Sequence, residues 1–266
     1  MSKLIKGFAW GRDVFNALVL DRFHPERKRG AQIAGTICRC LSFHARSKIR
    51  QVDLRELLPK LSNRAVEQVI LPGPSVDFGD VGSQGGYHVL GSIAQALQPR
   101  LILETGTYLG VSACAMALNA PPDCRIFTVD LPDDASGADV PGLNTLDQTH
   151  VATSRHRVGE AFLRSSIRDR VTQIRADSMT FRAEEQMKNV DLVYVDGGHS
   201  LPVVTKDTEN AFRVLAADGT IVWDDYFHMY PGVVEFLDRL AGQYPLHGIK
   251  GTNYVIYSRR WHPQAR

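Results

Sequence analysis

The hydrophobic pattern of the chain changes character near residue 71. Beyond that point, short apolar runs of strand length alternate with longer segments whose apolar residues recur at helical spacing. Strands are expected at residues 101–105, 125–130, 170–177, 191–196, 219–225 and 253–259, and helices at 87–98, 111–119, 202–215 and 232–242. Strands that alternate with helices predict an α/β fold, with a parallel sheet that carries helices on both faces.

The first 70 residues follow a different pattern. Apolar residues between Phe8 and Phe23 recur at roughly helical spacing, among basic residues. Residues 1–60 contain 13 Lys and Arg against 5 Asp and Glu, whereas the rest of the chain contains 18 against 24. A helical extension that packs on the main domain or on a second subunit is expected. A basic amphipathic surface for a membrane or a nucleic acid is the alternative. We therefore expect a basic helical extension (1–70), a main domain (71–266) and a homodimer.

Two Gly- and Pro-rich or irregular segments interrupt the pattern. Residues 71–86 are expected to be a loop or a boundary, and residues 131–150 a lid or a disordered loop. No apolar run approaches the roughly 20 residues that span a bilayer. The cysteines form no C-x-x-C pair and no zinc-binding spacing, which is typical of reduced thiols in a cytoplasmic protein.

Acidic residues end five successive strands of the expected sheet. In an open parallel sheet, ligands bind beyond the carboxyl ends of the strands. A single acid there is weak evidence because turns favour Asp, but a series of five indicates a site. These acids are Glu104, Asp130, Asp177, Asp196 and the pair Asp224–Asp225.

The first of these strand ends carries the pattern E-x-G-x-x-x-G, in "ETGTYLG" (104–110). It differs from the G-x-G-x-x-G of a dinucleotide site, and an acidic floor suits a ligand that carries positive charge. The motif resembles the first motif of the class I S-adenosylmethionine-dependent methyltransferases. The resemblance covers roughly residues 85–260, and "VDLVYVDGGHS" and "LAADGTIVWDDY" are similar to the fourth and fifth motifs of small-molecule O-methyltransferases. It implies a Rossmann-like, doubly wound, mostly parallel seven-stranded sheet.

The resemblance assigns cofactor contacts to the strand ends. Glu104, with the turn that contains Gly106, Thr107 and Gly110, would surround the methionine end of S-adenosylmethionine. Asp130, followed by Leu131, would accept hydrogen bonds from the ribose hydroxyls, as its position 20 residues after Gly110 also suggests. The remaining expected contacts are Asp177 and Ser178 at the adenine, and Asp196.

The fourth and fifth strand ends predict a second function for the same edge. One helix joins these strands, so they should be neighbours, and Asp196 should meet Asp224 and Asp225. Three such carboxylates suit a hard divalent cation, Mg²⁺ especially. The pattern resembles the macrolide-sugar O-methyltransferases of the mycinamicin and macrocin type, in which the acids bind Mg²⁺ and the histidine is the base. By that resemblance Asp196 and His199 are catalytic. The family has Glu where this chain has Asp224.

The acceptor is expected to be a small hydroxylated molecule, such as a sugar or a secondary metabolite. Tyr226, Phe227 and His228 follow the acid pair and would face it, with His228 as a second candidate base. His199 could instead be an ordinary residue before a helix. Methylation without a metal, and a cofactor-binding protein without activity, are the alternatives. No nucleic-acid partner is expected, because the main domain is net acidic and lacks an Asn-Pro-Pro-Tyr-like motif.

Overall fold

A computed structural model describes residues 47–59, 65–67, 78–135, 142–154 and 156–261. The chain divides into two compact units, Met1–Ser47 and Lys48–Arg266, and every element named below lies in the second. The expected helices of the first 46 residues lie outside the described residues, so the helical extension and the homodimer stay predictions. Among the described helices, none has the length and apolar character that a membrane crossing requires.

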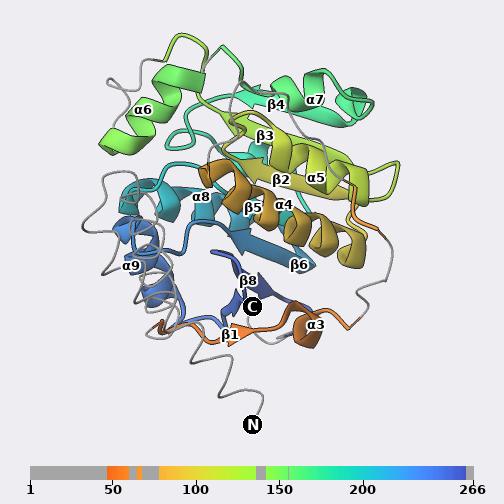
Figure 1. Cartoon of the computed structure of the whole chain (residues 1–266), viewed down its shortest axis with the longest axis vertical. Coiled ribbons are helices and arrows are strands. Elements are labelled where there is room, and N and C mark those ends of the chain that lie inside the picture. The colour runs from red at the N-terminus through yellow and green to blue at the C-terminus, as the bar shows by residue number, and fades with distance from the viewer. Residues whose placement is uncertain (1–46, 60–64, 68–77, 136–141, 155, 262–266) are drawn as a thin grey trace, which may run out of the picture. The chain divides into compact units, whose positions relative to one another are not determined.

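The second unit is built on one mixed sheet, and its α/β class confirms the fold expected from the sequence (Figure 1). The strand order is β1-β7-β8-β6-β5-β2-β3-β4; β8 runs antiparallel to its neighbours β6 and β7, and the other pairs are parallel. The strands are β1 (Gln51–Val52), β2 (Leu101–Thr105), β3 (Arg125–Asp130), β4 (Val171–Arg175), β5 (Val190–Val195), β6 (Leu215–Trp223), β7 (His247–Ile249) and β8 (Val255–Ser258).

The sheet has eight strands where seven were expected. The two shortest strands, β1 and β7, were not among the expected ones, because two or three residues carry no readable periodicity. β1 lies within the segment 1–70, and Gln51 pairs with Gly248 of β7. The sheet therefore begins inside the segment that was assigned to the extension.

The described helices are α3 (Leu54–Leu57), α4 (Phe78–Leu97), α5 (Val111–Asn119), α6 (Thr145–Ser154), α7 (Glu160–Leu163), α8 (Leu201–Val214) and α9 (Pro231–Leu240), with 3-10 turns η3 (Arg168–Arg170) and η4 (Ala183–Glu185). α4 begins inside the segment 71–86, which was expected to be a loop. Glycine disfavours a helix only weakly, and packing overrides that preference. A Cβ at Gly86 would stand 2.7 Å from the hydroxyl of Tyr254, so a glycine is what lets α4 pack this closely.

Helices cover both faces of the sheet. Tyr194 and Val222, which are partners across β5 and β6, belong to the same core cluster as the buried residues of α4 and α5. The next pair, Val195 and Trp223, points to the opposite face because side chains alternate along a strand. There the indole Nε1 of Trp223 donates a 2.8 Å hydrogen bond to Thr208 of α8. Trp223 is fully buried.

The strand order reverses at β2. β2 lies between β3 and β5, so the chain turns to one side of the sheet after β2 and to the other side before β5. The amide of Asp196 donates a 2.9 Å hydrogen bond to the carbonyl of Thr105, which joins the carboxyl ends of the two strands. Such a switch point is where α/β sheets bind ligands.

Cys114 and Cys124 are buried and form no disulfide. This agrees with the reduced thiols expected from the sequence. Cys38 and Cys40 lie outside the described residues.

Candidate active site

The glycine turn after β2 is shaped by contacts within the protein. Gly106 and Gly110 have φ angles of +86° and +78°, a region that favours glycine. A Cβ at Gly106 would stand 1.9 Å from the carbonyl oxygen of Asp196, and one at Gly110 would stand 2.6 Å from the ring of Phe162. The resemblance assigned these glycines to a turn that surrounds the methionine end of the cofactor. The structure shows that Gly106 makes room for the turn after β5.

Asp130 holds the same turn from the end of β3. Its carboxylate accepts hydrogen bonds from the amides of Thr107 (3.0 Å), Tyr108 (2.9 Å) and Leu131 (2.8 Å). Burial raises the pKa of Asp130, and the three amide donors oppose that rise. Asp130 therefore lies beside the glycine turn as expected, and it fixes the backbone of residues 107 and 108 there.

Glu104 lies beneath this turn and is fully buried. Its two oxygens accept 2.5 Å hydrogen bonds from the hydroxyls of Ser112 and Thr128, and the Thr128 hydroxyl lies 2.7 Å from that of Thr107. Burial raises the pKa of Glu104 to about 7. Both oxygens are thus used inside the protein, so Glu104 reaches the turn through Thr128 and Thr107.

Asp177 and Ser178 follow β4, the strand next to β3. Asp177 accepts a 2.9 Å hydrogen bond from the amide of Met179, and the side-chain amide of Asn210 lies 3.4 Å from the carbonyl oxygen of Ser178. Both residues are half-buried at the carboxyl edge of the sheet. Asp177 and Ser178 therefore lie at the carboxyl edge of the sheet, where the sequence analysis placed them.

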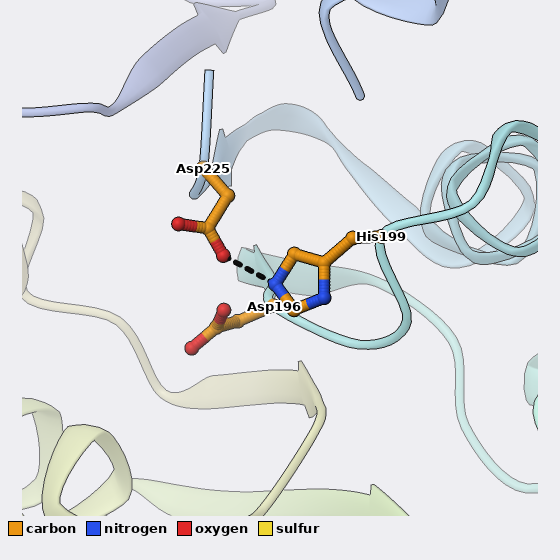
Figure 2. Close-up of side chains that lie close together, drawn as sticks. All are labelled: Asp196, His199 and Asp225. Carbon is orange, nitrogen blue, oxygen red and sulfur yellow. Dashed lines mark hydrogen bonds and ion pairs between the residues drawn. The ribbon is translucent and has the colours of Figure 1, made fainter. Parts of the chain in front are cut away.

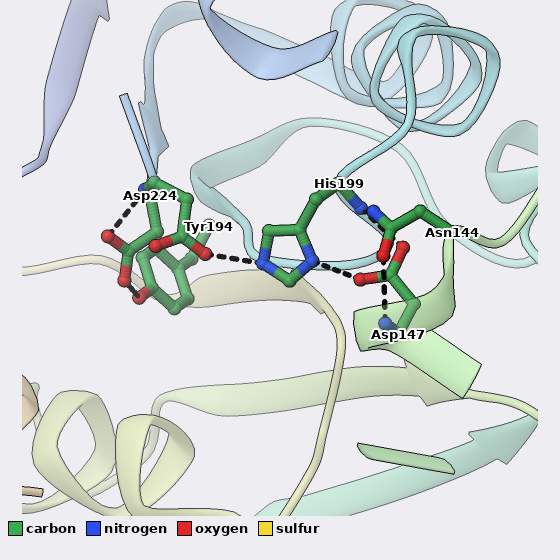
Figure 3. A network of polar contacts seen from close by, with 6 residues as sticks. Asn144, Asp147, Tyr194, His199 and Asp224 are labelled. Atoms are coloured by element: carbon green, nitrogen blue, oxygen red, sulfur yellow. Dashed lines mark hydrogen bonds and ion pairs between the residues drawn. The ribbon is translucent and has the colours of Figure 1, made fainter. Parts of the chain in front are cut away.

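His199 lies between two carboxylates. Its Nδ1 contacts Asp147 of α6, and its Nε2 lies 2.5 Å from Oδ2 of Asp225. Figure 2 shows Asp225 at one ring nitrogen, and Figure 3 shows Asp147 at the other. Tyr230 stacks on the ring, with 4.2 Å between centroids and an interplanar angle of 19°. The imidazole is therefore held on both nitrogens and on one face.

The neighbouring acids control the charge of His199. The hydrogen bonds and charges of Asp147 and Asp225 outweigh burial and raise the pKa of His199 to about 10. The ring is thus an imidazolium in this arrangement. Burial, Asp224 and Asp225 raise the pKa of Asp196 well above its usual range. Crowded acids at this edge were expected from the sequence, and they perturb one another as expected.

A candidate cation-binding group consists of Asp196, His199 and Asp225. Each offers one ligand atom, and these atoms lie within 4.8 Å of one another. Figure 2 shows the three side chains directed toward a common point from the ends of β5 and β6. Two carboxylates and an imidazole form a donor set that divalent metals accept.

Asp224 was expected to be a metal ligand, but it lies outside this group. Its Oδ2 accepts a 2.6 Å hydrogen bond from the hydroxyl of Tyr194, and its Oδ1 accepts one of 2.6 Å from the amide of Asp225 (Figure 3). Asp225 has a φ angle of +61°, so the chain turns sharply between the two acids. Burial and Asp225 raise the pKa of Asp224 to about 7. The turn directs the two side chains to different partners.

The expected acceptor-facing residues divide into two kinds. Tyr226 is buried, and its hydroxyl donates a 2.6 Å hydrogen bond to Asp238 of α9, so the expectation that it faces the acceptor is corrected. His228 is half-buried, packs edge-on against Phe227 and is not part of the group formed by Asp196, His199 and Asp225. Tyr230, two residues after His228, contacts His199 directly.

Asp147 is the residue that sequence reasoning missed. It belongs to the segment 131–150, which was singled out only as an irregular loop that tends to be functional. Helix α6 begins inside that segment and covers residues 145–154. No periodic signal links Asp147 to His199, which lies 52 positions later. The only usable signal was an acid in a segment suspected of being a lid.

Comparison with known proteins bears on the part of the chain that holds this site. Residues 103–226 match a family model described as a methyltransferase domain. That segment includes the glycine turn, Asp147, His199 and the acids at the ends of β3 to β6. No curated protein sequence is significantly similar to the chain.

Several solved structures resemble the fold. The SAH-bound methyltransferase PaMTH1 from Podospora anserina is 20% identical over 65% of this chain and 76% of that chain, with a TM-score of 0.47. The O-methyltransferase from Bacillus cereus in complex with SAH is 19% identical over 71% and 83%, with a TM-score of 0.46. The O-methyltransferase TomG from Streptomyces achromogenes is 20% identical over 71% and 83%, with a TM-score of 0.44.

Proposed function

We propose that this protein is an S-adenosylmethionine-dependent O-methyltransferase that methylates a hydroxyl of a small molecule. The observation that carries the proposal is the contact between the glycine turn and the turn after β5. Gly106 lies directly against Asp196, and His199 lies three residues further on. A cofactor held by the first turn would therefore have its methyl group close to the imidazole and carboxylates of the second. The match of residues 103–226 to a methyltransferase domain supports the same conclusion.

The residues at the strand ends fit a cationic cofactor. The ends of β2, β3 and β5 carry the acids Glu104, Asp130 and Asp196. Burial raises the pKa of each of them, and a bound sulfonium and amino group would stabilise their ionised form, whereas a pyrophosphate would not. Asp130 would take the ribose hydroxyls, while Asp177 and Ser178 would lie at the adenine.

Methyl transfer requires that the acceptor oxygen lose its proton. As the oxygen forms a bond to the methyl carbon, the sulfur–carbon bond breaks and the electron pair stays on the sulfur. We assign the proton to His199, whose Nε2 faces Asp196 and Asp225. The imidazolium form cannot accept it. His199 is therefore a base only when Asp225 is drawn away from the ring.

A divalent cation, Mg²⁺ or another, would provide that condition. Asp196 and Asp225 would hold it, with the imidazole within reach of the same point. When bound, the cation lowers the pKa of the acceptor hydroxyl. Its positive charge would also compete with His199 for Asp225 and leave Asp147 as the partner of the ring.

A metal-independent methyltransferase is the second candidate. The observation in its favour is the direct 2.5 Å contact between Nε2 of His199 and Oδ2 of Asp225, which lets Asp225 serve to position the ring or the acceptor. The presence of both the glycine turn and the Asp147–His199 pair argues against a protein that binds the cofactor without activity. The macrolide-sugar subtype rests on the resemblance in residues 196–199 and 224–225 and stays a proposal.

Transfer of a labelled methyl group from S-adenosylmethionine to fractionated small-molecule cell extract tests the function. The purified protein should place label in a low-molecular-mass fraction, and His199→Ala should lower the rate by roughly 10²–10⁴-fold, the usual contribution of a general base. Label found only on macromolecules, or no transfer to any fraction, would contradict the proposal.

A further inference from the structure

Asp147 contacts His199 through both of its carboxylate oxygens. Oδ1 meets Nδ1 of the ring, and Oδ2 accepts a 3.0 Å hydrogen bond from the backbone amide of His199. Only 4% of the Asp147 side chain is exposed. One carboxylate thus fixes both the position of the backbone at residue 199 and the orientation of its ring (Figure 3).

The carboxylate of Asp147 is directed away from its own helix. Asp147 lies in the first turn of α6, where an acid can stabilise the helix through its free amides. The side chain of Asn144 provides that function instead, because its oxygen accepts a 3.0 Å hydrogen bond from the amide of Asp147. Both oxygens of Asp147 are directed to a residue 52 positions later. The contact therefore serves the turn after β5.

Packing on the other side of His199 fixes the same orientation. Tyr230 stacks on the imidazole, and a Cβ at Gly232 of α9 would stand 2.7 Å from the carbonyl oxygen of His199. The ring is thus confined between α6 and the start of α9. Of its two nitrogens, Nδ1 is directed to α6 and Nε2 to the ends of β5 and β6.

We infer that Asp147 is a positioning residue, which holds the proton on Nδ1 of His199 so that Nε2 presents its lone pair to the acceptor hydroxyl. This inference rests on the proposed function. In the transfer step, the acceptor proton moves to Nε2, the acceptor oxygen bonds the methyl carbon, and the cofactor leaves as a neutral thioether. The Nδ1 proton stays on His199 throughout, hydrogen-bonded to Asp147, and the carboxylate stabilises the imidazolium that forms. A carboxylate, an imidazole and a hydroxyl act in the same relationship in serine hydrolases.

Asp147→Asn tests this role, because the amide keeps the size of the side chain and removes its charge. Asp134→Asn is the matched control, since it makes the same change at an exposed position of the same segment. The first measurement is an NMR spectrum of the imidazole nitrogens in full-length protein labelled with ¹⁵N-histidine, recorded with S-adenosylhomocysteine. Comparison with the spectrum of His199→Gln assigns the signals of His199. The Nδ1-bound proton of His199 should shift or vanish in Asp147→Asn and stay unchanged in Asp134→Asn.

Methyl transfer to the labelled extract fraction provides the second measurement. Asp147→Asn should lower kcat by roughly 10²–10⁴-fold, in the range of a lost base or a wrong tautomer, with KM and S-adenosylhomocysteine affinity within about twofold. In a His199→Ala background, Asp147→Asn should cause no further loss, because residues that act as a unit are not additive.

Two results would overturn the inference. One is a ring spectrum of His199 in Asp147→Asn that does not differ from that of the wild type. The other is a loss of activity on adding Asp147→Asn to His199→Ala that equals the loss it causes in the wild type. The spectrum separates this inference from the proposed function. If wild-type protein binds no S-adenosylhomocysteine, the proposed function fails, whereas the spectrum of the protein alone still reports whether Asp147 fixes the ring.

Discussion

Gly106 and Asp196 are packed so closely that a methyl-sized group at Gly106 would stand 1.9 Å from the carbonyl oxygen of Asp196. A hydrogen bond also joins the two segments, because the amide of Asp196 donates to the carbonyl of Thr105, the residue before Gly106. The turn expected to hold the cofactor and the turn that leads to His199 are therefore one rigid unit at the switch point of the sheet.

Gly106→Ala should disrupt this unit. The added Cβ must push the backbone at Asp196 away, and backbone cannot yield as a flexible side chain can. The variant should lose S-adenosylhomocysteine affinity by at least about tenfold and should also unfold at a lower temperature. Calorimetry and thermal denaturation measure the two effects.

Gly251→Ala is the matched control. Gly251 has a similar φ angle of +82°, but an added Cβ there meets nothing within 4 Å among the described residues. The variant should show only the cost of a left-handed backbone, about 1–2 kcal/mol. Equal losses of stability and cofactor affinity in both variants would show that the contact with Asp196 is unimportant.

Asp224 and Asp225, the acid pair after β6, should contribute unequally to metal binding. Asp225→Asn should abolish binding of Mg²⁺ or Mn²⁺, because Asp225 belongs to the candidate cation-binding group. Asp224→Asn should weaken it less, since the oxygens of Asp224 are used by Tyr194 and by the amide of Asp225. Titration calorimetry with each metal measures this, and a larger loss in Asp224→Asn would contradict the assignment.

Activity should depend on a divalent cation in the favoured mechanism. Prolonged EDTA should abolish methyl transfer, Mg²⁺ should restore it, and S-adenosylhomocysteine binding should survive the treatment. An enzyme that is indifferent to chelation would favour the metal-independent candidate.

Asp207 of α8 should make stability depend on pH. It is fully buried, without an ion-pair partner that would offset the desolvation of its charge among the described residues. Burial raises its pKa from 3.8 to about 7, although the nearby hydroxyls of Ser178 and Thr105 oppose the rise. The folded state holds the proton of Asp207 more tightly than the unfolded state does. The contribution of protonated Asp207 to folding stability is therefore fully present below pH 3.8 and is lost as the pH rises through about 7.

Asp207→Asn should therefore stabilise the protein at high pH. One pKa unit corresponds to about 1.4 kcal/mol, so the gain above pH 7 should reach at most roughly 4 kcal/mol and should shrink toward pH 4. Denaturant unfolding at several pH values measures it. A gain that does not change with pH would show that Asp207 is not the source.

Much of the sheet could be predicted because its central strands are buried on both faces. The expected bounds of β2 and β3 agree with the structure, at 101–105 and 125–130. Long apolar runs of this kind have few alternatives. β1, β7 and α6 were not found, because two strands of two or three residues and a polar helix carry almost no hydrophobic signal.

The site was predictable only as far as the strand order defines it. Acids at the ends of neighbouring parallel strands must meet, and Asp196 does meet Asp225. The direction of each side chain was not predictable. The left-handed backbone at Asp225 separates it from Asp224, and the contact of Asp147 with His199 joins elements that no local pattern connects.

The central claim is that the glycine turn binds S-adenosylmethionine. Titration calorimetry of the full-length protein with S-adenosylmethionine, S-adenosylhomocysteine and NAD tests it most directly. Binding of the first two ligands and no binding of NAD is the predicted result. No heat with either sulfur compound, together with clear binding of NAD, would contradict it.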